Sequence, residues 1–197
     1  ERFWLGPEGG QYSLYFNAGD SFKIANWQVP ALIDTVTYEV IQSSATQATF
    51  SKKASIINYS GARFDLQIER KISLLTKQET EAALHASLSD STNFVAYQTE
   101  NQIQNLGADW TKENGLLSIW LLGMFTPSEN TVVIIPFHPA PNAKELINTN
   151  YFGEIPEDRL TIKDSVLFFT CDGKYRSKLG LPPAIAKSIA ASFDFQK

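Results

Sequence analysis

The clearest pattern in the chain is the alternation of apolar and polar positions over residues 63–75. The apolar side chains occupy every second position, at Phe64, Leu66, Ile68, Ile72 and Leu74. Only Arg70 breaks this apolar set, and the positions between are polar or charged. A period of two predicts one long strand with a wet face, on which the alternating charges form a solvated surface.

Weaker alternation predicts further strands on either side. The expected strands are 2–5, 11–16, 21–27, 35–42, 47–54, 55–59, 93–106, 131–136, 159–162 and 166–170. Residues 116–125 form a continuous apolar run, which is typical of a strand buried on both faces. We expect this run and strand 131–136 to form the centre of the core.

Two segments have helical features. Thr76 and Glu79 have the spacing of a capping box, which predicts a short helix ending near Ala86. Residues 182–191 begin with two prolines and are compatible with either a helix or an extended linker. The predicted fold is therefore all-β, an antiparallel β-sandwich with one or two short helices.

Composition narrows the class of protein. The 197 residues suit a single domain with a substantial core, and the 12% aromatic content favours strands. The net charge is −4 with no basic run longer than two residues, which argues against a nucleic-acid partner.

No apolar run approaches the ~20 residues of a transmembrane segment. Cys171 is the only cysteine, so no internal disulfide can form, and two histidines argue against a catalytic zinc site. No calcium site and no cofactor are proposed.

The opening stretch carries the first candidate site. Arg2, Trp4 and Glu8 lie within eleven residues, with Glu8 on a glycine-rich bend. These groups suit a sugar. The guanidinium can donate hydrogen bonds to hydroxyls, the carboxylate can accept them from hydroxyls, and the indole ring can cover the apolar face of the sugar. The alternative is a surface ion pair on a strand–turn–strand. Trp27 is a candidate for the same platform, or a core residue.

A second polar centre follows Asp172. The cations Lys174, Arg176 and Lys178 occupy every second position, so an extended segment would place them on one face. That face suits an acidic sugar or a phosphate, or it protects a strand edge from aggregation. The central hypothesis is that this cluster and the opening cluster meet at one saccharide-sized hollow.

Four segments carry a family resemblance. Arg2-Phe-Trp-Leu-Gly-Pro-Glu-Gly-Gly-Gln11 resembles part of an uncharacterised bacterial family near the galactose mutarotases (aldose 1-epimerases), and the match recurs at residues 26–30, 110–120 and 172–178. The resemblance implies a mutarotase-like supersandwich with a carbohydrate-facing cleft, in a periplasmic or secreted protein. Its members are longer and usually take the catalytic glutamate from a later part, so the domain, residues 1–197, is expected to be incomplete.

His138 is the general-acid candidate that this resemblance suggests. It follows a predicted core strand and is held by two prolines, and mutarotases pair such a histidine with a carboxylate base. Glu8 and Glu113 are the candidate bases. The alternative is a loop histidine that bonds to backbone.

The leading interpretation is a carbohydrate-binding protein, with sugar modification left open. The expected substrate-binding residues are Arg2, Trp4, Glu8, Trp27, Lys174 and Arg176, and the catalytic candidates are His138 and Glu8. The alternatives are an aldose 1-epimerase and a non-catalytic structural or interaction domain.

Overall fold

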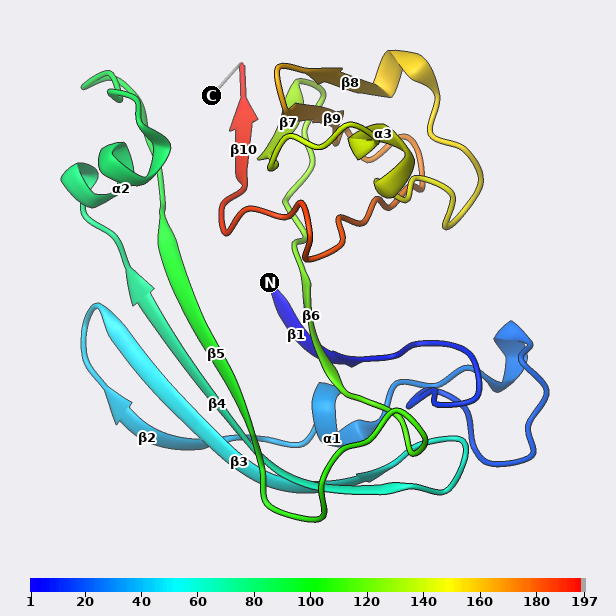
Figure 1. Cartoon of the computed structure of the whole chain (residues 1–197). Coiled ribbons are helices and arrows are strands. Elements are labelled where there is room, and N and C mark those ends of the chain that lie inside the picture. Colours follow the sequence, from blue (N-terminus) through cyan, green and yellow to red (C-terminus); the bar gives the residue numbers. More distant parts are fainter. Residues whose placement is uncertain (196–197) are drawn as a thin grey trace. The chain divides into compact units, whose positions relative to one another are not determined.

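The computed structural model describes residues 1–195 and contains mostly strands. Within these residues there are ten strands in three antiparallel sheets, with three short α-helices (Figure 1). This confirms the predicted all-β antiparallel fold of the sandwich class. The chain forms two compact units, Glu1–Met124 and Phe125–Lys197. The assignment of the whole chain to one mutarotase-like domain stays a prediction.

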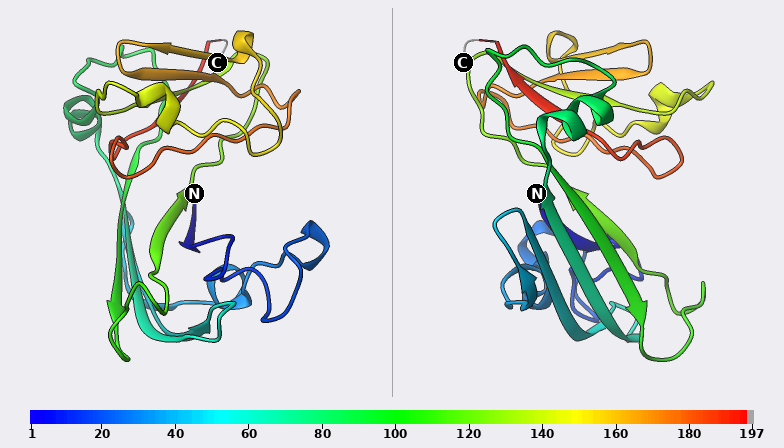
Figure 2. Two further views of the ribbon diagram at one scale, coloured as in Figure 1. Left: turned by 45° about the vertical axis from the view of Figure 1, so that its right-hand side comes forward. Right: turned by 90° about the vertical axis from the view of Figure 1, so that its left-hand side faces the viewer.

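The larger sheet of the first unit has the order β2-β3-β4-β5. Its strands are β2 (Glu39–Ser43), β3 (Gln47–Ile57), β4 (Arg63–Leu74) and β5 (Tyr97–Asn105). Figure 2 shows β3, β4 and β5 running side by side. The predicted long strand is β4, and Phe64, Leu66 and Ile68 on its apolar face are buried. The two strands predicted over 47–59 are a single strand, β3.

A two-stranded sheet, β1 (Arg2–Gly6) with β6 (Ser118–Leu122), completes the first unit. Trp4 is opposite Trp120 in this pair. The core of the unit joins Phe3 and Leu5 of β1 to Leu66 and its neighbours on β3 and β4. The apolar run 116–125 contains the predicted strand, β6, but the expectation that it is buried on both faces was wrong. Strand β6 pairs with β1, and Ile119 and Leu121 on it are exposed.

The segment between β1 and β2 is irregular, so the strands predicted over 11–16 and 21–27 were wrong. It contains a 3-10 turn, η1 (Ile24–Asn26), and one helical turn, α1 (Ala31–Asp34). Hydrogen bonds from side chains to the backbone stabilise this segment, which has no strand ladder. The Tyr15 hydroxyl, for example, donates to the Leu5 carbonyl at 2.8 Å.

Helix α2 (Lys77–Leu84) begins with the predicted capping box. The Thr76 hydroxyl accepts from the Glu79 amide, and the Glu79 carboxylate accepts from the Thr76 amide at 2.8 Å. His85 ends the helix in the left-handed conformation, at φ 53°. The helix therefore stops two residues short of the predicted end.

The second unit contains a sheet of order β10-β7-β9-β8. Its elements are β7 (Thr131–Pro136), α3 (Ala143–Leu146), η2 (Glu157–Arg159), β8 (Leu160–Lys163), β9 (Val166–Thr170) and β10 (Ala191–Asp194). The strands predicted over 159–162 and 166–170 correspond to β8 and β9, which pair antiparallel. Phe137, Leu167 and Ile185 are central to the core. Residues 182–191 form turns and enter β10 rather than forming a helix. Among residues 1–195, no helix is long and apolar enough to cross a membrane.

Candidate functional site

A polar hollow of about 500 Å³ opens beside the start of β1 in the first unit. Its walls come from β1, from α1 with the turn after it, and from β4. The lining residues are Glu1, Arg2, Phe3, Trp4, Ile33, Asp34, Thr35, Tyr38 and Arg70. Two of the sequence-predicted residues, Arg2 and Trp4, are thus brought together there.

Asp34, on α1, joins these two residues. Its Oδ1 accepts from Arg2 Nη1 at 3.0 Å and from Trp4 Nε1 at 3.2 Å. Within residues 1–195, Asp34 Oδ2 accepts no hydrogen bond, and Arg2 Nε and Nη2 donate none. The Arg2 side chain is half exposed and that of Asp34 is 26% exposed, so these groups are open to a ligand. Asp34 is not among the sequence-predicted site residues, because nothing in the sequence spacing of α1 links it to β1.

Arg70, on β4, also lines the hollow. Its side chain is only 15% exposed; Nη2 donates to Glu1 Oε1 at 2.7 Å and Nε donates to Asn101 Oδ1 at 2.8 Å. The guanidinium also lies over the Phe3 ring, 5.2 Å from its centre. The break in the apolar alternation of β4 was the sequence feature that could have identified it, because a cation at a core-facing position needs partners.

Lys52, on β3, holds the segment that carries Asp34. Its Nζ donates to the Leu32 carbonyl at 2.6 Å and to the Val36 carbonyl, and lies 4.0 Å from the centre of the Tyr38 ring. Burial lowers the pKa of Lys52 and raises the pKa of Tyr38, an effect on Tyr38 that Arg70 partly opposes. The buried Tyr38 hydroxyl has no hydrogen-bond partner in the described part of the chain.

The indoles of Trp4 and Trp27 belong to an aromatic cluster. The ring centre of Trp4 lies 5.5 Å from that of Trp120 and 6.2 Å from that of Trp27. Trp27 stacks on Tyr15, with their ring centres 5.7 Å apart. Trp27 packs against the core of the first unit and does not line the hollow. In this arrangement the indoles support the wall of the hollow, and Trp4 contributes its N–H to Asp34.

Glu8 lies on the turn after β1, outside the residues that line the hollow. Its carbonyl accepts from the Ser13 hydroxyl. Burial raises the pKa of Tyr15, and the negative charges of Glu8 and Asp34 raise it further. The other candidate base, Glu113, is exposed, and its carbonyl accepts from Tyr12.

The remaining predicted residues belong to the second unit. His138 is exposed, and its amide donates to the Ile185 carbonyl at 2.8 Å. Lys174 Nζ lies 3.4 Å from Glu129, and Arg176 lies over the ring of Phe152. A common site of these residues with Arg2 and Glu8 stays a prediction.

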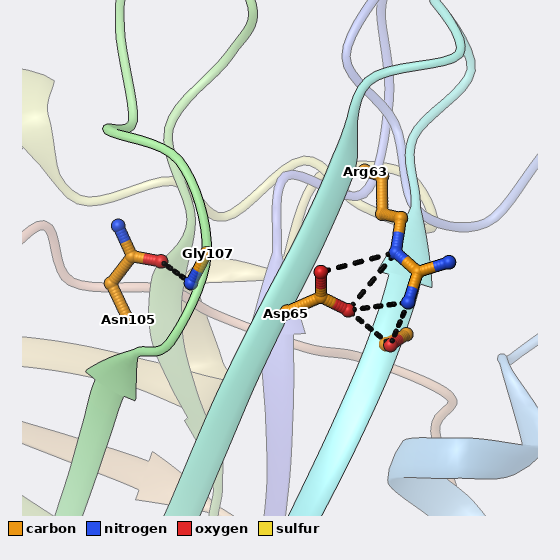
Figure 3. Close-up of polar contacts among 5 residues, drawn as sticks. Arg63, Asp65, Asn105 and Gly107 are labelled. Atoms are coloured by element: carbon orange, nitrogen blue, oxygen red, sulfur yellow. Dashed lines mark hydrogen bonds and ion pairs between the residues drawn. The ribbon is translucent and has the colours of Figure 1, made fainter.

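A second, smaller hollow of about 310 Å³ lies on the polar face of β3 and β4. Its carboxylate, Asp65, is already bound: Arg63 Nε and Nη2 donate to it at 2.8–3.1 Å, and the Ser55 hydroxyl also donates (Figure 3). The Arg63 bond holds the pKa of Asp65 below its usual range. Nearby, Asn105 accepts from the Gly107 amide. These groups satisfy one another, so the hollow beside β1 is the better candidate.

No group of three or more His, Cys, Asp or Glu side chains in residues 1–195 is placed to hold a metal ion. The fold and the hollow define an all-β protein with a polar, aromatic-backed depression beside its first strand. The chain belongs to a family of unknown function, DUF6786, whose model matches residues 1–197. No curated protein and no solved structure matches the chain.

Proposed function

We propose that the protein binds a carbohydrate in the hollow beside β1. The observation that carries this proposal is the sharing of Asp34 by Arg2 and Trp4. This sharing fixes the carboxylate while leaving Oδ2 to accept from a sugar hydroxyl, and Arg2 Nε and Nη2 to donate to a second one. A donor and an acceptor side by side match a pair of adjacent hydroxyls.

The size and the rigidity of the hollow also support the proposal. Its volume of about 500 Å³ falls within the usual range of small-molecule sites, roughly 300–1,000 Å³. Lys52 anchors the Asp34 segment and the aromatic cluster supports Trp4, so little ordering is needed when a ligand binds. The resemblance to the mutarotase-like proteins adds a reason of a different kind, since that fold presents a carbohydrate-facing cleft.

The experiment is an NMR titration of the ¹⁵N-labelled protein with a panel of monosaccharides and disaccharides. We expect shifts centred on the amides of residues 2–4 and 33–38. Asp34→Asn and Arg2→Gln should each weaken binding at least tenfold. A blank panel, or shifts spread evenly over the chain, would reject the proposal.

The matched controls are Asp65→Asn and Arg63→Gln, which break the ion pair on the polar face of the same unit. They should leave affinity within twofold. Equal losses in both pairs of variants would mean that the effect is general electrostatics rather than a site.

Anomer exchange separates binding from the rival interpretation of an aldose 1-epimerase. Binding alone predicts that polarimetry of glucose or galactose shows only the uncatalysed rate. Acceleration that disappears in His138→Ala would assign the rival activity and its acid.

A further inference from the structure

In the second unit, two irregular segments lie side by side. Asn148 and Gly180 exchange backbone hydrogen bonds at 3.0 and 2.9 Å. Further along, the Tyr175 hydroxyl donates to the Glu154 carbonyl at 3.3 Å. Between these two links, the side chains of segment 175–178 cover those of loop 151–152.

The contacts in this stretch pair cations with rings. Arg176 Cζ lies 4.2 Å from the centre of the Phe152 ring, and Lys178 Nζ lies 4.3 Å from that of Tyr151. The rings of Tyr151, Phe152 and Tyr175 stay partly exposed, at 38%, 50% and 42%. We name this the cation–aromatic surface, formed by Tyr151, Phe152, Tyr175, Arg176 and Lys178.

The cations of this region differ in what neutralises them. Arg159 is bound to Asp172 with both side chains largely buried, and Lys174 lies 3.4 Å from Glu129. Arg176, in contrast, makes no ion pair with any described residue. Its charge is therefore available to an anion.

The position of the Arg176 guanidinium over the Phe152 ring also affects how it can bind a ligand. A guanidinium that lies over a ring occupies its flat face, while its N–H groups point outward in the plane. The Phe152 ring thus orients a fork of donors that suits the two oxygens of a carboxylate. The exposed rings beside it offer an apolar face to the C–H groups of a pyranose.

We propose that the cation–aromatic surface binds the carboxylate of an acidic saccharide, with Arg176 as the residue that recognises it. This site lies wholly in the second unit and does not depend on the hollow beside β1. A uronate unit supplies both parts of the chemistry, an oxyanion for the guanidinium and a ring face for the aromatic side chains.

The test is a calorimetric titration of the whole chain with trigalacturonic acid and with its methyl ester, which has the same sugars without the charges. We expect the acid to bind at least tenfold more tightly than the ester. Arg176→Gln and Arg176→Lys should each weaken binding of the acid at least tenfold, because lysine keeps the charge but loses the planar fork. Phe152→Leu should weaken it several-fold by releasing the guanidinium.

Lys163→Gln is the matched control, because it removes an exposed cation of the same unit. It should leave affinity within twofold. Absence of binding, full affinity in Arg176→Lys, or equal loss in Lys163→Gln would overturn the proposal. Inorganic sulfate that competes as strongly as the trisaccharide would also overturn it, by showing a simple anion site.

Discussion

The guanidinium of Arg70 lies over the ring of Phe3, with its central carbon 5.2 Å from the ring centre. This contact joins β4 to β1, two strands that belong to different sheets of the first unit. It explains how a charged residue occupies an apolar position of β4: the ring covers one face of the guanidinium, while Glu1 and Asn101 bind its edge.

Replacing Arg70 should therefore destabilise the first unit. Arg70→Met leaves the largely buried carboxylate of Glu1 without its cationic partner, and we expect a loss of about 3 kcal/mol in the free energy of unfolding. All four tryptophans, Trp4, Trp27, Trp110 and Trp120, lie in this unit. Urea unfolding followed by tryptophan fluorescence thus measures its stability.

Lys71→Met is the control for this change. Lys71 is the next residue on β4, and it pairs with Glu100 at the surface, where an ion pair contributes below about 1 kcal/mol. If both variants lost the same stability, Arg70 would be acting as an ordinary surface charge.

The capping box should govern the local stability of α2. Thr76→Ala removes the acceptor for the Glu79 amide and should destabilise the helix by about 1 kcal/mol, which is about fivefold faster exchange of its amides. Hydrogen exchange resolved by NMR measures this rate. Thr46→Ala, at an exposed turn, should leave the α2 amides unchanged.

Gly115 should not tolerate a side chain. Its φ is +96°, and an added Cβ would lie 3.0 Å from Asn58 Nδ2 and from Tyr12. We expect Gly115→Ala to cost about 2 kcal/mol in urea unfolding followed by tryptophan fluorescence. Gly9→Ala adds the same methyl group into open space, so it should stay within about 0.5 kcal/mol of the parent. Similar values for the two glycines would contradict this account.

Asp172 should make the second unit sensitive to acid. The Arg159 hydrogen bond, helped by the Lys174 amide, holds the pKa of Asp172 below its usual range. The folded state therefore binds fewer protons than the unfolded state as the pH falls below about 4, and the stabilisation present at neutral pH is lost through that window.

The measurement is a urea titration at pH 7 and at pH 3, followed by the amide signals of β7 and β9. Asp172→Asn should be less stable than the parent at pH 7 and should lose less stability between the two pH values. A parallel loss in both proteins would assign the acid sensitivity to other groups.

Strand β4 and the capping box could be predicted because each depends on neighbours within one element. The period of two in β4 and the Thr76–Glu79 spacing are local, and both are present in the structure. The run at 116–125 misled for the opposite reason. Its apolar residues suggested burial on both faces, but β6 pairs with β1, and that choice depends on a strand more than a hundred residues away.

The candidate site also contains residues that local sequence could identify and residues whose role depends on tertiary packing. Arg2 and Trp4 could be found because they lie together on β1, whereas their common partner Asp34 comes from a turn whose position depends on packing against β3. Arg70 was visible as a break in a pattern and only acquires a role once β1 lies across from it. The strands expected over 11–16 and 21–27 were wrong, because side-chain anchors such as the Tyr15 hydroxyl hold this part of the chain in turns.

The bonds of Lys52 to the carbonyls of Leu32 and Val36 have a consequence for how this protein can diversify. A flexible tether of methylene groups, rather than a fixed register of strands, sets the height of the α1 turn above the sheet. Substitutions of Lys52 or within the α1 turn can therefore change the shape of the hollow around Asp34, while the pairing of the strands beneath it stays the same. Relatives that differ in ligand preference should differ first at these few positions.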